Sequence, residues 1–316
     1  MTHPKYWLAR HSAKPDDVKR AFKLAEMLVA RAPPPWEPAK RGRRPKFSPR
    51  THAAICITVV CLNLTYREVE GDAPAFLGMT IDHSTVGWAF KRLRKNYLEL
   101  LLLLLRQKLE KEVTSELYVV DSTGISTPRF KERRYAFKTV RKHVCLKLHA
   151  LVGYSPKDSA LVVYSASVTG ENVHDSTQFK TLISNVWARG EPLLGDPAYD
   201  AEFVRESAKL HGFKPIIKPA ERDKGGPHGF ARREVFEEFE ENRELYRLRK
   251  VAEGFFGGIE TRYDSKTRFK LLHLQVFNLL LMAVAHNLRT LARIRAQNNE
   301  EILIFVWIYS TIPPAP

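Results

Sequence analysis

Cysteine is scarce in this sequence of 316 residues, which contains only Cys56, Cys61 and Cys145. Three irregularly spaced cysteines exclude a disulfide framework, and none of them has a cysteine or histidine at the spacing of a zinc site. Cys56 and Cys61 lie in an apolar segment, so we expect them to be small core residues. The scarcity of cysteine favours the reducing cytoplasm as the location of the protein.

A long hydrophobic run is also missing. The two most apolar segments, Leu100–Leu105 and Ile302–Ile312, are shorter than the about 18 residues that a membrane-spanning helix needs. The polar and mixed segment Met1–Ala13 does not resemble a signal peptide. We therefore expect no membrane partner.

Acidic residues are too few to balance the basic ones. The chain has 35 Asp and Glu against 51 Lys and Arg, which gives a formal net charge of +16 and a pI near 9.8. Solubility alone explains such an excess less well than a polyanionic partner does, and the commonest such partner is nucleic acid. Apolar residues make up 44% of the sequence, enough for the core of one large domain or two ordinary ones.

The first part of the sequence is predicted to be helical and to contain a basic arm. Apolar residues recur at helical spacing over residues 16–32, and Pro33-Pro34-Pro35 ends that helix. The basic arm spans residues 40–50, and its cations include Arg41, Arg43, Arg44 and Lys46. Such arms enter the minor groove of DNA, although a solvated linker that adds affinity for phosphates explains the composition equally well.

Residues 66–93 have the pattern of a helix-turn-helix. A short helix is predicted from Tyr66 to near Gly71, and a second helix follows Asp82 or Ser84, either of which can cap it. The outward-facing side chains that we expect to contact DNA are His83, Thr85 and Lys91. An ordinary helical bundle explains the pattern about as well, but the net charge and the basic arm favour a DNA-binding region.

From Leu117 the pattern changes to that of β-strands. Three antiparallel strands are predicted first, and short strands then alternate with helices, so we expect an α/β domain with a mixed sheet. The predicted strands cover residues 117–121, 143–152, 160–168, 193–196 and 214–217. Turns are expected near residues 123–130 and 154–158. The predicted organisation is a helical DNA-binding region over residues 1–112, this α/β domain over 113–296 and a C-terminal tail over 297–316.

Two aspartates directly follow predicted buried strands. Asp121 comes after Tyr118-Val119-Val120, and Asp196 comes after Leu193-Leu194-Gly195. If the two strands are neighbours, the carboxylates converge and can bind one or two Mg²⁺ or Mn²⁺ ions. Taken singly, however, each aspartate is better explained as the cap of a helix or the start of a turn.

A third acidic residue lies in a segment predicted to be helical. Tyr246, Arg249 and Glu253 are spaced i, i+3 and i+7 there, which places them on one helix face. By itself this spacing fits an exposed helix with favourable charge pairs better than it fits a functional site.

In combination, these segments resemble the DDE transposases of bacterial and archaeal insertion sequences. Tyr246-Arg247-Leu248-Arg249-Lys250-Val251-Ala252-Glu253 matches the signature of Tyr, two residues, Arg, three residues and Glu that one group of these enzymes has. Residues 119–124 and 194–200 resemble the segments of the first and second Asp, and residues 169–175 resemble the segment ahead of the intervening helix. The resemblance covers roughly residues 118–292, with the motifs in the expected order.

The resemblance implies an RNase H-like catalytic domain. In it, Asp121, Asp196 and Glu253 would bind two Mg²⁺ (or Mn²⁺) ions, and water and then a DNA 3′-OH would attack phosphodiesters at the element ends and the target. Tyr246 and Arg249 would position the DNA strand. Double-stranded DNA is the implied partner. A homodimer on DNA is expected because two ends must be held together, and the expected location is the nucleoid in the cytoplasm.

One position departs from the family, which usually has Lys or Arg seven residues after the Glu, where this sequence has Glu260. The departure leaves open a transposase-derived DNA-binding protein without catalytic activity, although all three acidic residues are present. Another RNase H-like nuclease is a third alternative, and the helical N-terminal region fits it less well.

A basic and aromatic segment, Arg129–His143, is predicted to be a DNA-facing loop. The residues that we expect to contact phosphates are Arg134, Lys138 and Arg141. A solvated hairpin explains the same composition.

Overall fold

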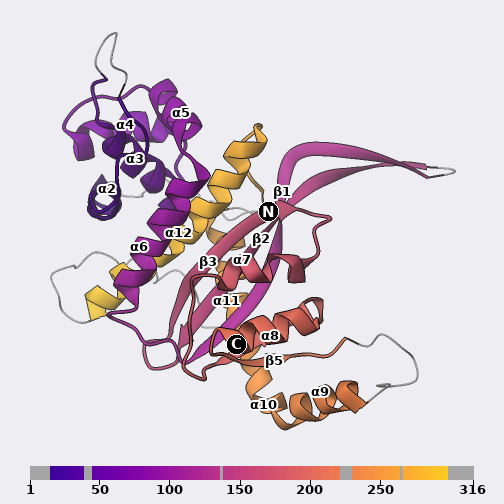
Figure 1. Ribbon diagram of the computed structural model, residues 1–316. Coiled ribbons are helices and arrows are strands. Elements are labelled where there is room, and N and C mark those ends of the chain that lie inside the picture. The colour runs from indigo at the N-terminus through magenta and orange to yellow at the C-terminus, as the bar shows by residue number, and fades with distance from the viewer. Residues whose placement is uncertain (1–14, 39–44, 136–137, 221–229, 264–265, 298–316) are drawn as a thin grey trace, which may run out of the picture. The chain divides into compact units, whose positions relative to one another are not determined.

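The computed structural model describes residues 15–38, 45–135, 138–220, 230–263 and 266–297. For Pro15 and for residues 129–135, 138–143 and 230–233 it describes the backbone alone. The chain divides into two compact units, one made of Met1–Leu105 and Val284–Pro316 and the other of Arg106–Ala283 (Figure 1). The domain limits predicted from the sequence stay predictions.

The first unit is built of helices. Its helices are α2 (Pro15–Val29), α3 (Pro49–Cys61), α4 (Tyr66–Leu77), α5 (His83–Arg92), most of α6 (Lys95–Leu109) and the C-terminal part of α12 (Leu272–Gln297). Every residue of α3 from His52 to Cys61 is buried, as expected of a helix that is apolar on all sides. These helices confirm the predicted helical N-terminal region.

The bounds of α4 and α5 test the predicted helix-turn-helix. Asp82, one of the two predicted caps, begins α5 by accepting a hydrogen bond from the backbone amide of Ser84 at 2.7 Å. The prediction that the preceding helix ends near Gly71 is wrong. α4 continues to Gly78, whose φ of +67° ends the helix with a left-handed residue. Packing of α4 against α2 and α5 outweighs the low helix propensity of one glycine.

The second unit contains a mixed sheet of five strands in the order β3-β2-β1-β4-β5. β1 (Leu117–Tyr135), β2 (Lys138–Ser155) and β3 (Ala160–Gly170) are antiparallel neighbours. β4 (Pro192–Gly195) is parallel to β1, and β5 (Lys214–Ile217) is parallel to β4. This arrangement confirms the predicted fold class, an RNase H-like α/β domain with a mixed sheet.

β1 is much longer than the sequence predicts. The turn expected near residues 123–130 is absent, because β1 continues to Tyr135 and pairs with β2, with one shift in register between Ser126 and Phe130. The turn propensity of the Ser, Thr, Gly and Pro residues in this segment is outweighed by the β2 partners, which are distant in sequence. β1 therefore extends far beyond β4, and the last pair between these two strands joins Val120 and Gly195.

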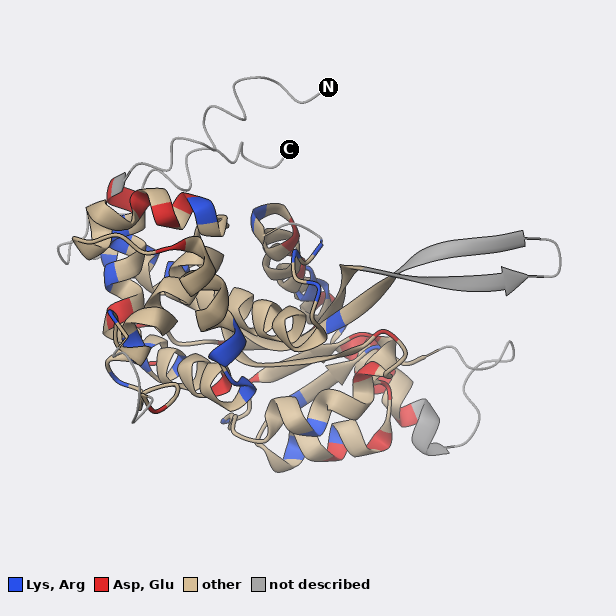
Figure 2. Ribbon diagram, turned by 90° about the horizontal axis from the view of Figure 1, so that it is seen from above, with Lys and Arg blue, Asp and Glu red and all other residues tan. Residues whose placement is uncertain are grey.

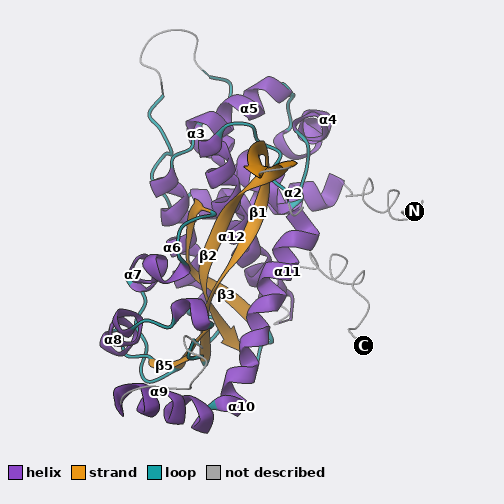
Figure 3. Cartoon of the chain, turned by 90° about the vertical axis from the view of Figure 1, so that its right-hand side faces the viewer, coloured by secondary structure: helices purple, strands orange, loops and turns teal. Residues whose placement is uncertain are grey.

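Helices cover both faces of this sheet (Figures 1 and 3). α11 contacts β1, and α7 contacts β2 and β3 from the other side. The helical elements of this unit after β3 are η1 (Asp175–Gln178), α7 (Phe179–Ile183), η2 (Pro197–Tyr199), α8 (Glu202–Leu210), α9 (Phe230–Glu241), α10 (Arg243–Tyr246), η3 (Arg247–Lys250), α11 (Val251–Tyr263) and the N-terminal part of α12. None of the helices described is long and apolar enough to cross a membrane.

Candidate active site

Asp121 lies inside β1, one residue beyond the last pair of β1 with β4. Its carboxylate accepts a hydrogen bond at Oδ1 from the backbone amide of Ser122 at 2.8 Å. At Oδ2 it accepts a hydrogen bond from Nη1 of Arg249 at 2.7 Å. Only 18% of the Asp121 side chain is exposed. The carboxylate is thus held on a strand and partly covered, as a rigid ligand or catalytic group has to be.

Asp196 follows the last residue of β4 and caps η2. Its Oδ1 accepts a hydrogen bond from the backbone amide of Ala198 at 3.0 Å, so the explanation of this residue as a cap is correct. β1 and β4 are nevertheless parallel neighbours, and Val120 pairs with Gly195. Asp121 and Asp196 therefore both lie one residue beyond the same pair, next to each other at the end of β4.

The two aspartates share an electrostatic environment. Burial raises the pKa of both carboxyl groups. The charge of Asp196 raises the pKa of Asp121 further, and the charge of Asp175 raises that of Asp196. Arg249 acts in the opposite direction on both groups. Partly buried carboxylates with one guanidinium between them leave a negative potential that a bound cation would relieve.

Tyr246 and Arg249 reach the same place from the helical segment that precedes α11. Tyr246 is the last residue of α10 and Arg249 lies in η3, so a 3-10 turn interrupts the helix that the sequence predicts. The Tyr246 ring packs on Phe239, with ring centroids 5.0 Å apart. Burial raises the pKa of Tyr246, and the charges of Asp196 and Asp121 raise it further, whereas Arg249 lowers it. The hydroxyl of Tyr246 therefore lies close to the two aspartates.

Glu253 is more exposed than the two aspartates. It lies in the first turn of α11, and its side chain is exposed. Among the residues that the structure describes, the carboxylate oxygens of Asp121, Asp196 and Glu253 do not all lie within 4.8 Å of one another. Instead, the guanidinium of Arg249 bonds to Asp121. The site thus has Asp121 and Asp196 beside each other at the end of β4, Arg249 bonded to Asp121, and Glu253 exposed on α11.

The buried hydroxyl of Tyr199 lies near the aspartates and feels their negative charge. Tyr199 is fully buried, and within the described part of the chain its hydroxyl has no hydrogen-bond partner. Burial raises the pKa of Tyr199 well above its ordinary value, and the charges of Asp175, Asp121 and Asp196 raise it further. Carboxylate oxygens are the ligands that Mg²⁺ and Mn²⁺ prefer, and Asp121 and Asp196 supply them beside this hydroxyl. The residues present therefore fit a divalent cation.

Asp175 joins this acidic group, although the sequence patterns did not single it out as a site residue. Its Oδ2 accepts a hydrogen bond from Oγ of Ser122 at 3.1 Å, and its Oδ1 forms an ion pair with Nζ of Lys147 at 2.8 Å. Nδ1 of the buried His149 lies 3.7 Å from Oδ1. The sequence signal for Asp175 is the resemblance of residues 169–175 to a segment of the family.

Glu260, the position that departs from the family, lies on α11 next to β1. Its Oε1 accepts a hydrogen bond from Oγ1 of Thr123 at 2.9 Å. Thr123 and Asp121 point to the same face of β1, because they are two residues apart on one strand. The carboxylate of Glu260 thus lies over β1 where the resemblance predicts a Lys or Arg side chain.

Half of the twelve residues predicted to contact DNA are outside the described residues or are described by their backbone alone. Arg41, Arg43 and Arg44 are outside the described residues. The positions of Arg134, Lys138 and Arg141 fall in the hairpin of β1 and β2, and their side chains are outside the description. In the described part of the basic arm, Nζ of Lys46 donates a hydrogen bond to the carbonyl oxygen of Thr80 at 2.9 Å. The ammonium group of Lys46 therefore binds a backbone carbonyl of its own unit.

The predicted recognition helix, α5, exposes a different set of side chains from the one expected. Lys91 is exposed, Thr85 is half-buried, and Nδ1 of His83 lies 3.1 Å from Oε2 of Glu70. Trp88 and Arg92, which the sequence patterns did not indicate, are both exposed, and the guanidinium carbon of Arg92 lies 4.2 Å from the Trp88 ring centroid. Lys and Arg residues occur on the ribbons of both units (Figure 2).

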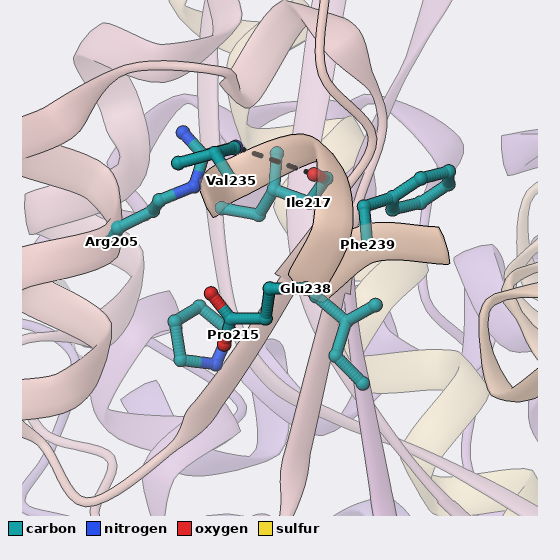
Figure 4. Close-up of a pocket in the computed structure, with 7 residues that line it drawn as sticks. Arg205, Pro215, Ile217, Val235, Glu238 and Phe239 are labelled. Carbon is teal, nitrogen blue, oxygen red and sulfur yellow. Dashed lines mark hydrogen bonds between the residues drawn. The ribbon is translucent and has the colours of Figure 1, made fainter. Parts of the chain in front are cut away.

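A shallow pocket between β5 and α9 contains none of the predicted site residues (Figure 4). It is lined by Arg205, Pro215, Ile216, Ile217, Val235, Glu238 and Phe239. Arg205 donates a hydrogen bond to the carbonyl oxygen of Ile217 at 3.3 Å and pairs with Asp200 at 2.6 Å. Arg205, the one cationic side chain that lines the pocket, is therefore already paired. We assign the pocket to the packing of α9, the helix whose Phe239 packs on Tyr246.

Comparisons with known proteins give one match to a protein family. Residues 113–288 match a family model described as the transposase DDE domain, and this match covers more than half of the chain. One solved structure with a similar shape is the cryo-EM structure of a piggyBac transposase synaptic complex with hairpin DNA. Its TM-score is 0.46 and its sequence identity 6%, over 94% of this chain and 77% of that chain. No match was found among curated proteins.

Proposed function

The chain belongs to the family of transposases with a DDE domain, and we propose that it is the transposase of an insertion sequence. In this proposal it cleaves phosphodiesters at the element ends and joins them to target DNA. The observation that carries the proposal is the position of Asp121 and Asp196 next to each other beyond the last pair of the parallel strands β1 and β4. Carboxylates on rigid neighbouring strands suit metal-dependent phosphodiester chemistry.

Asp121, Asp196 and Glu253 are the proposed ligands of two Mg²⁺ or Mn²⁺ ions. When bound, such ions activate an attacking oxygen and stabilise the leaving oxygen of a phosphodiester. Asp121 and Asp196 lie next to each other, whereas Glu253 is exposed in the first turn of α11. Among the described residues the three carboxylates do not all lie within 4.8 Å of one another, so the proposal requires them to draw together when cations and DNA bind.

Arg249 and Tyr246 are the residues proposed to hold the DNA strand. In the protein alone, Arg249 donates its hydrogen bond to Oδ2 of Asp121. We propose that its guanidinium transfers to a phosphate of the bound strand, whose two oxygens match the fork of donors, and so frees Oδ2 of Asp121. Tyr246, supported by Phe239, would contact the same strand.

Double-stranded DNA, first the element ends and then the target, is the proposed partner. The helical N-terminal unit, with Lys91 exposed on α5, is proposed to bind the element ends. Because two ends must be held together during transposition, we propose a homodimer on DNA. Binding of this kind would place the protein on the nucleoid.

A DNA-binding protein without catalytic activity is the second candidate function. The observation that favours it is the position of Glu260, which accepts a hydrogen bond from Thr123 on the same face of β1 as Asp121. A negative charge there repels the phosphates of a strand that approaches Asp121. Catalysis would then require that the DNA path avoid Glu260.

A cleavage assay separates these two functions. Purified protein is mixed with supercoiled plasmid that carries the flanking ends of the element, in the presence of Mg²⁺, Mn²⁺ or EDTA. The transposase is expected to cut at the ends in both metals and not in EDTA. For any variant that loses one of the proposed metal-binding carboxylates, the matched control is Asp158→Asn, in the turn between β2 and β3. Binding to the ends without any cut would contradict the proposal and favour the inactive protein.

A further inference from the structure

Two neighbouring strands and η1 place a group of polar side chains on the face of β1 opposite to Asp121. Ser122 of β1 pairs with His149 of β2, and Lys147 lies two positions before His149 on β2. Side chains of paired residues, and of residues two apart on a strand, lie on one face of a sheet. Asp175, the first residue of η1, lies against this face.

Lys147 fastens Asp175 to the sheet. Its Nζ lies 2.8 Å from Oδ1 of Asp175 and donates a second hydrogen bond to the carbonyl oxygen of Val173 at 3.0 Å. The exposed fractions of the side chains are 26% for Lys147 and 15% for Asp175. Burial lowers the pKa of His149, which favours the neutral imidazole. Lys147 is therefore the cation that balances Asp175 in this group.

A chain of hydrogen bonds leads from this pair to Asp121. Oγ of Ser122 donates to Oδ2 of Asp175 at 3.1 Å, and the backbone amide of the same serine donates to Oδ1 of Asp121 at 2.8 Å. Ser122 lies beyond the end of β4, so on that side β1 no longer has a neighbouring strand. The side-chain bond to Asp175 replaces that support.

Asp175 also acts on the second aspartate through its charge. It is close enough to Asp196 to raise the pKa of that carboxyl, and it contributes likewise to the raised pKa of the buried Tyr199. Both oxygens of Asp175 accept a bond, one from Ser122 and one from Lys147, and these bonds hold the carboxylate at the face of β1 opposite to Asp121. Groups placed in this way around metal ligands tune affinity and orientation without binding the metal.

We infer that the Lys147–Asp175 ion pair is a positioning pair, which orients Asp121 through Ser122 and sets the affinity of Asp121 and Asp196 for a divalent cation. The inference rests on the proposed metal-binding function. It makes a prediction that a purely structural role does not make: the two members of the pair act in opposite directions. Loss of Asp175 leaves the cation of Lys147 unbalanced beside the site, whereas loss of Lys147 leaves an added carboxylate.

The test is a titration of the full chain, without DNA, with Mn²⁺, followed by the electron paramagnetic resonance signal of the free ion. Asp175→Asn is expected to weaken Mn²⁺ binding about tenfold. Lys147→Met is expected to tighten it about threefold, since one positive charge is removed at a distance of several ångströms. Asp158→Asn and Lys157→Met make the same charge changes at the opposite end of β2, in the turn before β3, and should leave binding unchanged.

Three outcomes are decisive. If Asp175→Asn and Lys147→Met weaken binding equally, or if Asp175→Asn binds like the wild type, the inference is wrong. Should Asp175→Asn fail to fold, Ser122→Ala replaces it, because it cuts the bond to Asp175 with no change in charge and is expected to weaken binding about threefold. If Asp121→Asn and Asp196→Asn leave binding unchanged, the proposed metal-binding function itself fails, whatever the other variants do.

Discussion

The two faces of β1 beside Asp121 are held in different ways. On one face, Ser122 bonds to Asp175, whose charge is balanced by Lys147, and these partners come from the sheet and from η1. On the other face, the partner of Asp121 is Arg249, which lies in a short 3-10 turn between two helices. The first face is assembled from elements that the sheet fixes, and the second depends on a separate helical segment.

The difference indicates which part of the site is preorganised. The sheet aligns Asp121 with Asp196 and supports them from below, before any DNA or cation is bound. The helical segment supplies Arg249, the exposed Glu253 and Glu260, which bonds to Thr123. In the proposed function, recognition of the strand is therefore coupled to rearrangement on the helical side, while the strand side stays in place.

The largest expected effect on cleavage comes from substitution of Asp121, which receives hydrogen bonds from Ser122 and from Arg249. Asp121→Asn keeps the size of the side chain but removes a proposed metal ligand, so cleavage at the element ends should fall by about a thousandfold or more. Binding to end DNA, measured by gel shift, should stay within about twofold, since the N-terminal unit is proposed to bind the ends. A parallel loss of binding and cleavage would show that Asp121 is structural.

A smaller effect is expected at the helical face. Arg249→Ala removes the proposed phosphate contact and should lower cleavage about 100-fold. The same variant should bind Mn²⁺ more tightly without DNA, because Oδ2 of Asp121 loses the guanidinium that occupies it. Arg249→Lys is the matched control, which keeps the charge but not the fork of donors. Weaker Mn²⁺ binding by Arg249→Ala would contradict the arrangement.

The side-chain bonds on the two faces should also contribute differently to the stability of the protein. The hydroxyls of Ser122 and Thr123, which are neighbours on β1, allow the comparison. Ser122→Ala removes a part-buried bond to a carboxylate and should lower the free energy of unfolding by about 2 kcal/mol. Thr123→Val removes an exposed bond to Glu260 and should cost about 0.5 kcal/mol or less. Urea denaturation of both variants measures the difference. Equal losses would mean that the two faces are equally fixed.

The smallest effect is a dependence of stability on pH. Burial raises the pKa of Asp196, so the folded protein disfavours its ionised form. The stability that the protonated form provides is present at low pH and is lost as pH rises through the raised pKa. In EDTA at neutral pH, Asp196→Asn should therefore melt about 2 °C above the wild type, and the gap should close near pH 4. A gap that widens at low pH would contradict the direction of the shift.

Local sequence patterns were sufficient to predict the strand that contains Asp121 and the strand that ends before Asp196. The short apolar runs before Asp121 and Asp196 predicted two strands, and the sheet makes these strands neighbours. The part played by Asp175 could not be predicted in the same way. Ser122, Lys147 and Asp175 come from three separate segments, and they meet because of the pairing register of β1 with β2, which a local pattern does not contain.

The same limitation explains the errors along β1 and in the helices. The segment 123–130 has the composition of a turn, but it is held extended by β2, whose contribution is not local. The i, i+7 spacing of Tyr246 and Glu253 assumed one continuous helix, whereas η3 lies between Tyr246 and α11. Spacing predicts a shared face only where the helix is regular.

In the proposed function, the bond of Arg249 to Asp121 couples two binding equilibria. A DNA phosphate that attracts the guanidinium raises the affinity of the site for a divalent cation, and by thermodynamic reciprocity a bound cation raises the affinity for that phosphate by the same factor. Without DNA, Arg249 then neutralises Asp121 and the protein cuts little. On DNA, Arg249 binds the phosphate and Asp121 is available to the divalent cation. An arginine that neutralises a catalytic carboxylate at rest would thus restrict a potentially harmful nuclease to the moment when its substrate is present.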